Sequence, residues 1–167
     1  MNGEELRRRY AAGERDFSGF DLKGVNVSGI DPDLDIGAYD KLCPDFAADL
    51  SEINLSGSDL TRAILAGANL SNANLTNANL TNAALERCNL TNTNLSGANL
   101  TKACLSGAEL NGTNMSGANL LYAAISQTYF GADVRGAINV NTVDFTGTPV
   151  RGLVLEDGTI IDSDHDW

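Results

Sequence analysis

Three cysteines and a single histidine are the residues of this sequence best suited to nucleophilic, redox or metal chemistry. Cys43, Cys88 and Cys104 have no metal-ligand spacing, and an odd number of cysteines disfavours a disulfide framework. His165 lies two residues from the end of the chain, so no Ser-His-Asp or Cys-His arrangement is expected on a rigid body. We therefore predict reduced thiols, no catalytic residues and no enzymatic activity. One alternative stays open, in which Cys104 is a redox-sensitive surface thiol.

Two acidic clusters are the remaining candidates for a metal site. The aspartates at 31, 33 and 35 are arranged like the start of a calcium loop, but Ile36 and Leu42 stand where an EF-hand requires Gly and Glu. The second cluster, residues 162–166, lies in an acidic tail that is expected to be mobile, and a tail seldom holds ligands in a fixed geometry. The sequence therefore predicts no metal and no cofactor.

The overall charge excludes several classes of partner. The chain has 22 acidic and 11 basic residues and a formal net charge of -11. Phosphate contacts require Lys and Arg, so direct binding to nucleic acid is disfavoured, as is binding to an anionic membrane surface. No stretch reaches the roughly 18 apolar residues of a membrane span, and no secretory signal is evident. We expect a cytoplasmic protein.

A repeat of five residues dominates the sequence. Leucine recurs at every fifth position from Leu50 to Leu110, and Met115, Leu120 and Ile125 continue the series. From Leu65 onward a small residue stands two positions before each leucine, Asn usually precedes the leucine, and Ser or Thr usually follows it. The expected core comprises Leu60, Leu65, Leu70, Leu75, Leu80, Leu85, Leu90, Leu95, Leu100, Leu105 and Leu110.

A period of five is incompatible with an ordinary helix or strand. On an α-helix, five residues advance by about 500°, so successive leucines would cover every face. On a straight strand, an odd period sends alternate leucines to opposite sides. The pattern favours a chain that turns a corner in every repeat, so that each leucine points toward one axis.

Runs such as Ala68-Asn69-Leu70-Ser71-Asn72 closely resemble the A(D/N)LXX motif of the pentapeptide-repeat family, which is abundant in cyanobacteria. The resemblance implies an all-β fold: a right-handed quadrilateral β-helix with four repeats per coil. Residues 48–125 fit the motif almost without interruption, over about sixteen repeats. With four repeats per coil, residues twenty apart stack on one another.

Segments that depart from the repeat define the rest of a single domain, residues 1–167. Residues 2–12 predict a short helix that caps the first coil, and 14–30 contain the first repeats. Residues 31–47 are a loop insertion, because the 23 residues from Val27 to Leu50 are not a multiple of five. The main array spans 48–149, a hairpin around Asp157-Gly158 forms a cap over 150–161, and 162–167 are the acidic tail.

The distribution of charge bears on function. Some family members resemble duplex DNA and inhibit DNA gyrase, and the acidic net charge of this chain favours such a role. However, residues 51–130 hold four acids and three bases, whereas 1–50 and 131–167 each have a net charge of -5. The repeats are thus nearly neutral, and the acids lie at the ends.

We therefore expect a non-enzymatic interaction or scaffold protein with no assigned physiological role, which presents a rigid polar wall and an irregular loop to a protein partner. An acidic mimic of DNA that binds or inhibits gyrase is the alternative. The hairpin over the last coil favours a monomer, although a dimer through an end coil stays open. The candidate contact residues of the loop are Asp33, Asp35, Tyr39, Asp40 and Leu42.

Overall fold

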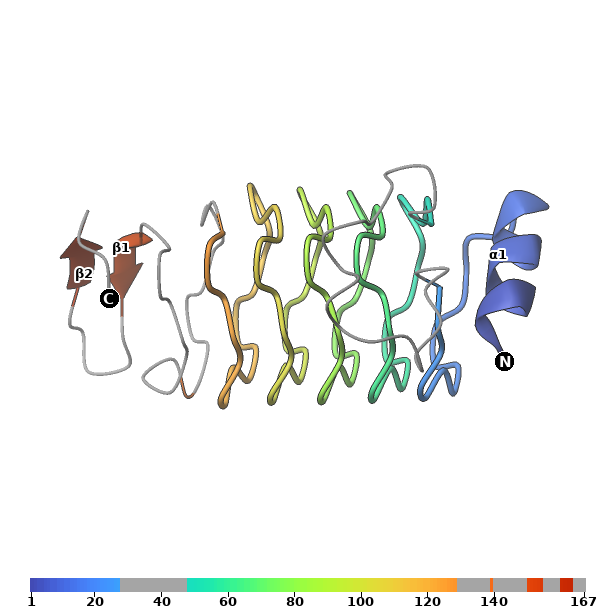
Figure 1. Ribbon diagram of the computed structural model, residues 1–167, viewed down its shortest axis with the longest axis horizontal. Helices are drawn as coiled ribbons and strands as arrows, with labels where there is room; N and C mark the ends of the chain where they lie inside the picture. Colours follow the sequence, from blue (N-terminus) through green and yellow to red (C-terminus); the bar gives the residue numbers. More distant parts are fainter. Residues whose placement is uncertain (28–47, 129–138, 140–149, 155–159, 164–167) are drawn as a thin grey trace, which may run out of the picture.

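The computed structural model describes residues 1–27, 48–128, 139, 150–154 and 160–163. The order of elements is α1 (Gly3–Ala11), a stack of coils, β1 (Val150–Val154) and β2 (Ile160–Ser163). Figure 1 shows α1 at one end of the stack and the coils following one another along its long axis. The helix in the described part of the chain is too short to cross a membrane.

Parallel bridges between residues twenty apart show that four repeats make one coil. Asp49 pairs with Asn69, Asn69 pairs with Asn89, and Asn89 pairs with Glu109. Each coil therefore has four sides of five residues. We call them faces A to D, and their buried central residues are Leu55, Leu75 and Leu95 for A, Leu60, Leu80 and Leu100 for B, Leu65, Leu85 and Leu105 for C, and Leu70, Leu90 and Leu110 for D.

Backbone hydrogen bonds join each coil to both neighbours. The N–H of Leu75 donates to the carbonyl of Asn94 at 2.7 Å in the next coil, and that of Asn74 donates to Ile53 at 2.9 Å in the preceding one. At the corner, the N–H of Ala78 donates to the carbonyl of Leu75 at 3.0 Å and closes a β-turn. Bonding between coils thus takes the place of the ladder of a flat sheet.

The corners require a residue with left-handed backbone conformation. In coils of the main array, the second residue after each leucine has a φ between 56° and 74°. A positive φ at the third position of a turn is the mark of type II, and it suits Gly and Asn. Glycine or asparagine occupies most corners, but Arg62, Lys102 and Tyr122 adopt the same conformation, at a cost of about 1–2 kcal/mol each.

The interior consists of stacked leucines, all fully buried. Small residues fill the corners of the interior, and where one is polar it donates to a backbone carbonyl. Thr93 Oγ1 donates to Leu70 O at 2.7 Å, and Thr113 Oγ1 donates to Leu90 O at 2.7 Å. Each polar group therefore enters the core without losing a hydrogen bond.

The first coil accommodates the insertion without losing the stacking order. Asp16 pairs with Asn54, Asp21 with Asp59, and Asn26 with Ile64, at a separation of 38 residues instead of 20. The first coil therefore contains 18 extra residues. They enter after Val27 on face C, and Leu50 then supplies face D.

Helix α1 packs against this first coil, close to the predicted range of 2–12. The Asn2 side chain accepts a hydrogen bond from the N–H of Glu5 at 2.8 Å and caps the helix N-terminus. Leu6 is fully buried, and the Tyr10 hydroxyl donates to Ser51 O at 2.8 Å. Arg7 donates to the carbonyl of Val27 at 3.2 Å.

The C-terminal strands form an antiparallel pair, with Leu153 opposite Ile161 and Val154 opposite Ile160. Strand β2 extends to Ser163, two residues beyond the predicted end of the cap at 161. Ser163 pairs with Val150, so pairing with β1 continues into the segment with acidic composition. The predicted turn at Asp157-Gly158, the loop 31–47 and most of 129–149 lie outside the described residues.

Candidate interaction face

The buried cysteine is part of the core. Cys88 has no exposed surface, and its Sγ donates to Leu65 O at 3.0 Å, in the same way as the threonines at equivalent positions. Burial raises the pKa of this thiol to about 12. Because the thiolate is the nucleophile, Cys88 is unreactive in the folded protein.

The other described cysteine points outward from face C and is partly buried. Burial raises the pKa of the Cys104 thiol, and the hydrogen bond to Ser106, with Sγ and Oγ 3.5 Å apart, lowers it less. A raised pKa does not favour the redox-sensitive thiol considered from the sequence. Within the described residues, no group of three His, Cys, Asp or Glu side chains is placed to hold a metal ion.

Asparagine and aspartate line the outer midline of faces A and B and most of face D. Each side chain accepts a hydrogen bond from the N–H two residues later, as Asn74 does from Thr76 at 3.1 Å. The amides also bond between coils, and Asn74 Nδ2 donates to Asn54 Oδ1 at 3.2 Å. We call each such column of Asn and Asp side chains an asparagine ladder. The side chains of a ladder satisfy one another's polar groups and stabilise the corner turns.

Face C lacks this ladder in the coils of the main array. Its outer midline is Ile64, Ala84, Cys104 and Ala124, which pair with one another at steps of 20 residues. The side chains of Ile64, Ala84 and Ala124 have no acceptor that could replace the asparagine bond to the corner, and Cys104 has only a weak sulfur acceptor. A net hydrogen bond is worth about 0.5–1.5 kcal/mol, so face C forgoes stabilisation that the other faces have. The result is an apolar strip with small side chains on a wall that is otherwise polar.

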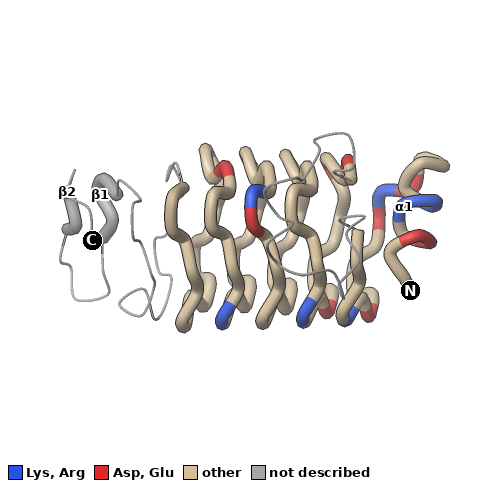
Figure 2. Tube along the Cα trace, in the orientation of Figure 1, with Lys and Arg blue, Asp and Glu red and all other residues tan. Residues whose placement is uncertain are grey.

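The basic residues of the main array border this face. Within residues 48–128 the bases are Arg62, Arg87 and Lys102, whereas the acids number five. Arg62 and Lys102 occupy the corner between faces B and C, and Arg87 occupies the corner between C and D. Figure 2 shows how sparse charge is along the coils compared with the region of α1. Face C is therefore the positive side of an acidic molecule.

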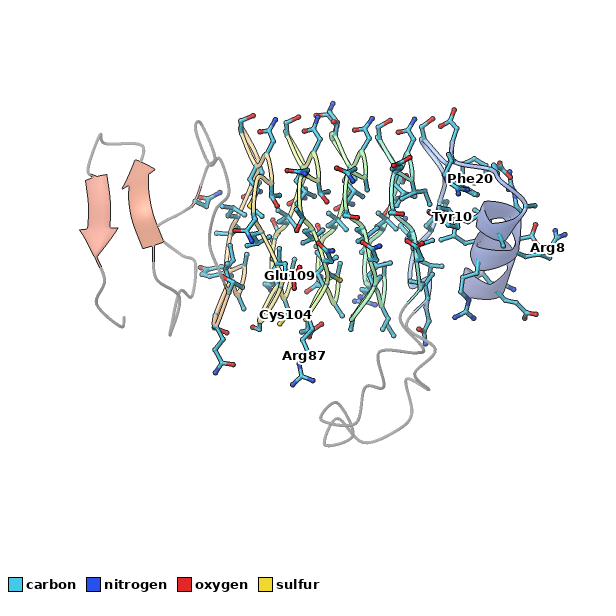
Figure 3. All side chains as sticks on the ribbon, turned by 90° about the horizontal axis from the view of Figure 1, so that it is seen from above. Arg8, Tyr10, Phe20, Arg87, Cys104 and Glu109 are labelled. Atoms are coloured by element: carbon cyan, nitrogen blue, oxygen red, sulfur yellow. The ribbon has the colours of Figure 1, made fainter. Side chains whose placement is uncertain are left out.

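Two further side chains complete the borders of face C. Tyr122 is 61% exposed and shares the corner column of Arg62 and Lys102. On the opposite border, Oε2 of Glu86 is buried and has no hydrogen-bond partner in the described part of the chain. Figure 3 shows Arg87 projecting away from the coils on the side where Cys104 lies. The exposed ring suits contact with another molecule, whereas the Glu86 oxygen is shielded from a partner at the surface.

The predicted contact residues of the loop, Asp33, Asp35, Tyr39, Asp40 and Leu42, lie outside the described residues. The structure does place the ends of this segment. The last described residue before it is Val27, which is the face C residue of the first coil, and the first described residue after it is Ala48, which precedes face D. The insertion thus begins at one end of face C.

A family model described as pentapeptide repeats matches residues 47–77, 78–117 and 93–130, with eight copies of the repeat. This chain belongs to the pentapeptide-repeat family. Family members form right-handed quadrilateral β-helices, and the coil of twenty residues found here agrees with four repeats per turn. A comparison with curated proteins gave no match.

Solved structures of other pentapeptide-repeat proteins resemble this one. A protein from the cyanobacterium Cyanothece 51142 is 28% identical over 85% of this chain and 99% of its own, with a TM-score of 0.47. One from Nostoc Pcc 7120 is 24% identical over 87% and 96%, with a TM-score of 0.51. One from the Arabidopsis thaliana thylakoid lumen is 33% identical over 62% and 68%, with a TM-score of 0.47.

Sequence reasoning missed face C as a distinct surface and treated all wall residues as equivalent. The signal was present, because Ile64, Ala84, Cys104 and Ala124 replace the usual Asn at intervals of twenty. It is diluted in the sequence because three other repeats, nearly all with Asn or Asp at this position, separate one departure from the next. Once four repeats form a coil, those four departures stand in one column.

Proposed function

We propose that this pentapeptide-repeat protein is a non-enzymatic interaction scaffold, which uses face C and the adjoining insertion as its contact surface. The observation that carries the proposal is that every midline position of face C within residues 48–128 lacks the usual Asn or Asp. Local rules of a fold are broken most often where function requires it. In this proposal the chain acts as a monomer and binds a protein partner.

Faces A and B are poorer candidates for specific contact. Their amides and hydroxyls already bond to one another, as Thr81 Oγ1 does to Asn79 Oδ1 at 2.7 Å and Asn119 Nδ2 does to Thr101 Oγ1 at 3.2 Å. A partner would have to break these bonds or leave them facing its own polar groups. The midline of face C offers apolar side chains that lose no hydrogen bond on being covered, although the hydroxyls of Ser106 and Ser126 bond to each other beside it at 2.8 Å.

The alternative, a gyrase-directed mimic of DNA, requires rows of acids along the rod. On face A the outer midline of the main array is Asn54, Asn74, Asn94 and Asn114, all uncharged. The bases on the borders of face C oppose mimicry further, since DNA has no positive side. The charge of the described coils therefore favours a scaffold over a mimic.

Affinity capture from cells that express the protein natively tests the proposal. The wild-type chain is compared with a ladder-restored variant, Ala84→Asn with Ala124→Asn, and with a matched variant of face B, Asn79→Ala with Asn119→Ala. A fourth chain has residues 31–47 replaced by a short Gly/Ser turn. We expect a partner that the ladder-restored variant loses and the face B variant keeps. A partner set that is the same for all four chains would contradict the proposal.

A further inference from the structure

Resting on the proposed function, we infer that face C binds an amphipathic α-helix of the partner, with its apolar side on the strip and carboxylates on one flank. The helix lies along the stack of coils, with its acidic flank toward Arg62 and Lys102. The proposal follows from the spacing of the coils, the size of the strip residues and the charge of the two borders.

The spacing of the coils suits a helix better than a strand. Coils joined by backbone hydrogen bonds repeat at about 4.8 Å. Side chains on one side of an α-helix repeat once per turn of about 5.4 Å, whereas those on one side of a strand repeat at about 6.6 Å. A helix along the stack thus places about one side chain against each coil on face C. Helix recognition of this kind uses anchor residues at i, i+3, i+4 and i+7.

Small residues on the strip permit close approach. Ala84 and Ala124 end at Cβ, and Cys104 adds a single sulfur, so three of the four midline side chains of face C are short. Ile64 begins the strip next to the first coil, where the insertion starts. Apolar side chains of a helix would fill the space over these short residues and exclude water from the strip.

Charge decides which helix is favoured. Arg62 and Lys102 are exposed and, among the residues that the structure describes, form no ion pair, whereas Lys23 pairs with Asp59 at 3.1 Å. They stand two coils apart, roughly 9.6 Å at the spacing of hydrogen-bonded strands. Positions i and i+7 of a helix are about 10.5 Å apart, so two acids at that interval face both bases.

Binding of designed peptides to the full chain, measured by fluorescence anisotropy, tests this inference. The probe is a helix of about 18 residues with Leu and Ala on one side, Glu at i and i+7 on one flank and Gln on the other. A second peptide has Lys in place of each Glu. We expect the acidic-flank peptide to bind at least tenfold more tightly than the basic-flank peptide, and to weaken as salt is raised.

Variants then locate the site. Arg62→Asn with Lys102→Asn removes both charges, while Asn82 in the same column shows that the corner accepts asparagine; we expect affinity to fall about fivefold to tenfold. The ladder-restored variant should lose about tenfold or more, and the face B variant should bind as the wild type does. Equal binding of both peptides, or full binding by the ladder-restored variant, would overturn the inference.

The outcomes separate this inference from the proposed function. If native capture identifies a partner that requires face C but the acidic-flank peptide does not bind, the scaffold function stands and the helical ligand is wrong. If light scattering shows a dimer that the ladder-restored variant loses, the occupant of face C is a second copy of the chain, and the helical partner is again excluded.

Discussion

Gly3 in α1 lies directly against the carbonyl group of Asn26, so that a Cβ added to Gly3 would be 1.7 Å from that oxygen. The obstacle is backbone of the first coil and cannot rotate away. This contact seats the helix on the coil that carries the insertion. The absence of one side chain thus sets how closely α1 approaches the solenoid.

Replacing Gly3 by Ala should therefore destabilise the protein despite the better helix propensity of alanine. We expect a loss of about 1–3 kcal/mol in the free energy of unfolding, as for other overpacked sites. Urea denaturation followed by circular dichroism measures it. The matched control is Glu4→Ala at the exposed neighbouring position, which should change stability by less than about 0.5 kcal/mol. Equal stability of the two variants would show that α1 shifts freely on the coil.

Replacing Lys102 by Asn should stabilise the fold. Lys102 has a φ of 57°, which costs a residue with a long side chain about 1–2 kcal/mol, whereas Asn82 one coil earlier has a φ of 56° and tolerates it. We expect the free energy of unfolding, measured by chemical denaturation, to rise by about 0.5–1 kcal/mol.

At another corner, Gly97→Ala should lower the free energy of unfolding by about 1–2 kcal/mol. Gly97 has a φ of +66°, and the new Cβ would meet Asn77 Oδ1 at 2.3 Å.

Replacing Ala84 by Asn should also stabilise the protein, by about 0.5–1 kcal/mol, because an asparagine there can accept from the N–H of the corner as Asn74 does. Thermal unfolding of the single variant measures the gain. Ala84→Ser is a control that adds a hydroxyl in place of the longer amide. A loss of stability in the asparagine variant would mean that face C differs from the other faces in backbone geometry rather than in side chains.

Acid should weaken the fold partly through Asp59. Hydrogen bonds from the Thr61 side chain and N–H, and then from Lys23, lower the pKa of Asp59 below its ordinary value of 3.8. A carboxyl whose folded pKa is depressed stabilises the fold above the unfolded value, and this contribution is lost as the pH falls through the folded pKa. Asp59→Asn should therefore lose less stability than the wild type between pH 6 and pH 3 in urea titrations. Parallel losses would contradict the assignment.

The two described thiols should differ in reactivity. In a Cys43→Ser background at pH 8, a thiol reagent should modify Cys104 slowly and leave Cys88 untouched until denaturant is added, since burial raises the pKa of Cys88 to about 12. Mass spectrometry of the labelled peptides identifies the site. Labelling of Cys88 in the native protein would show that the core opens locally.

The stacking of the leucines was accessible from sequence, because the motif specifies an inward residue at every fifth position. Leu60, Leu80 and Leu100 were expected in one column, and the structure places them on face B, fully buried. Helix α1 was also predictable, since Asn2 and the acids after it are ordinary signals of a helix start. The end of β2 at Ser163 was not predictable to the residue, because strand pairing depends on residues distant in the chain.

The five-residue period alone determined that this chain turns a corner in each repeat and buries its leucines, because a repeated local pattern repeats a local conformation. Only the tertiary structure decided which repeats share a face. Closure after twenty residues brings Ile64, Ala84, Cys104 and Ala124 together, and the 18 extra residues of the first coil are absorbed without disturbing that alignment. Residues adjacent in the chain determine the conformation of each corner, whereas hydrogen bonds between coils determine which residues stack in one column. Face C exists only because of that stacking.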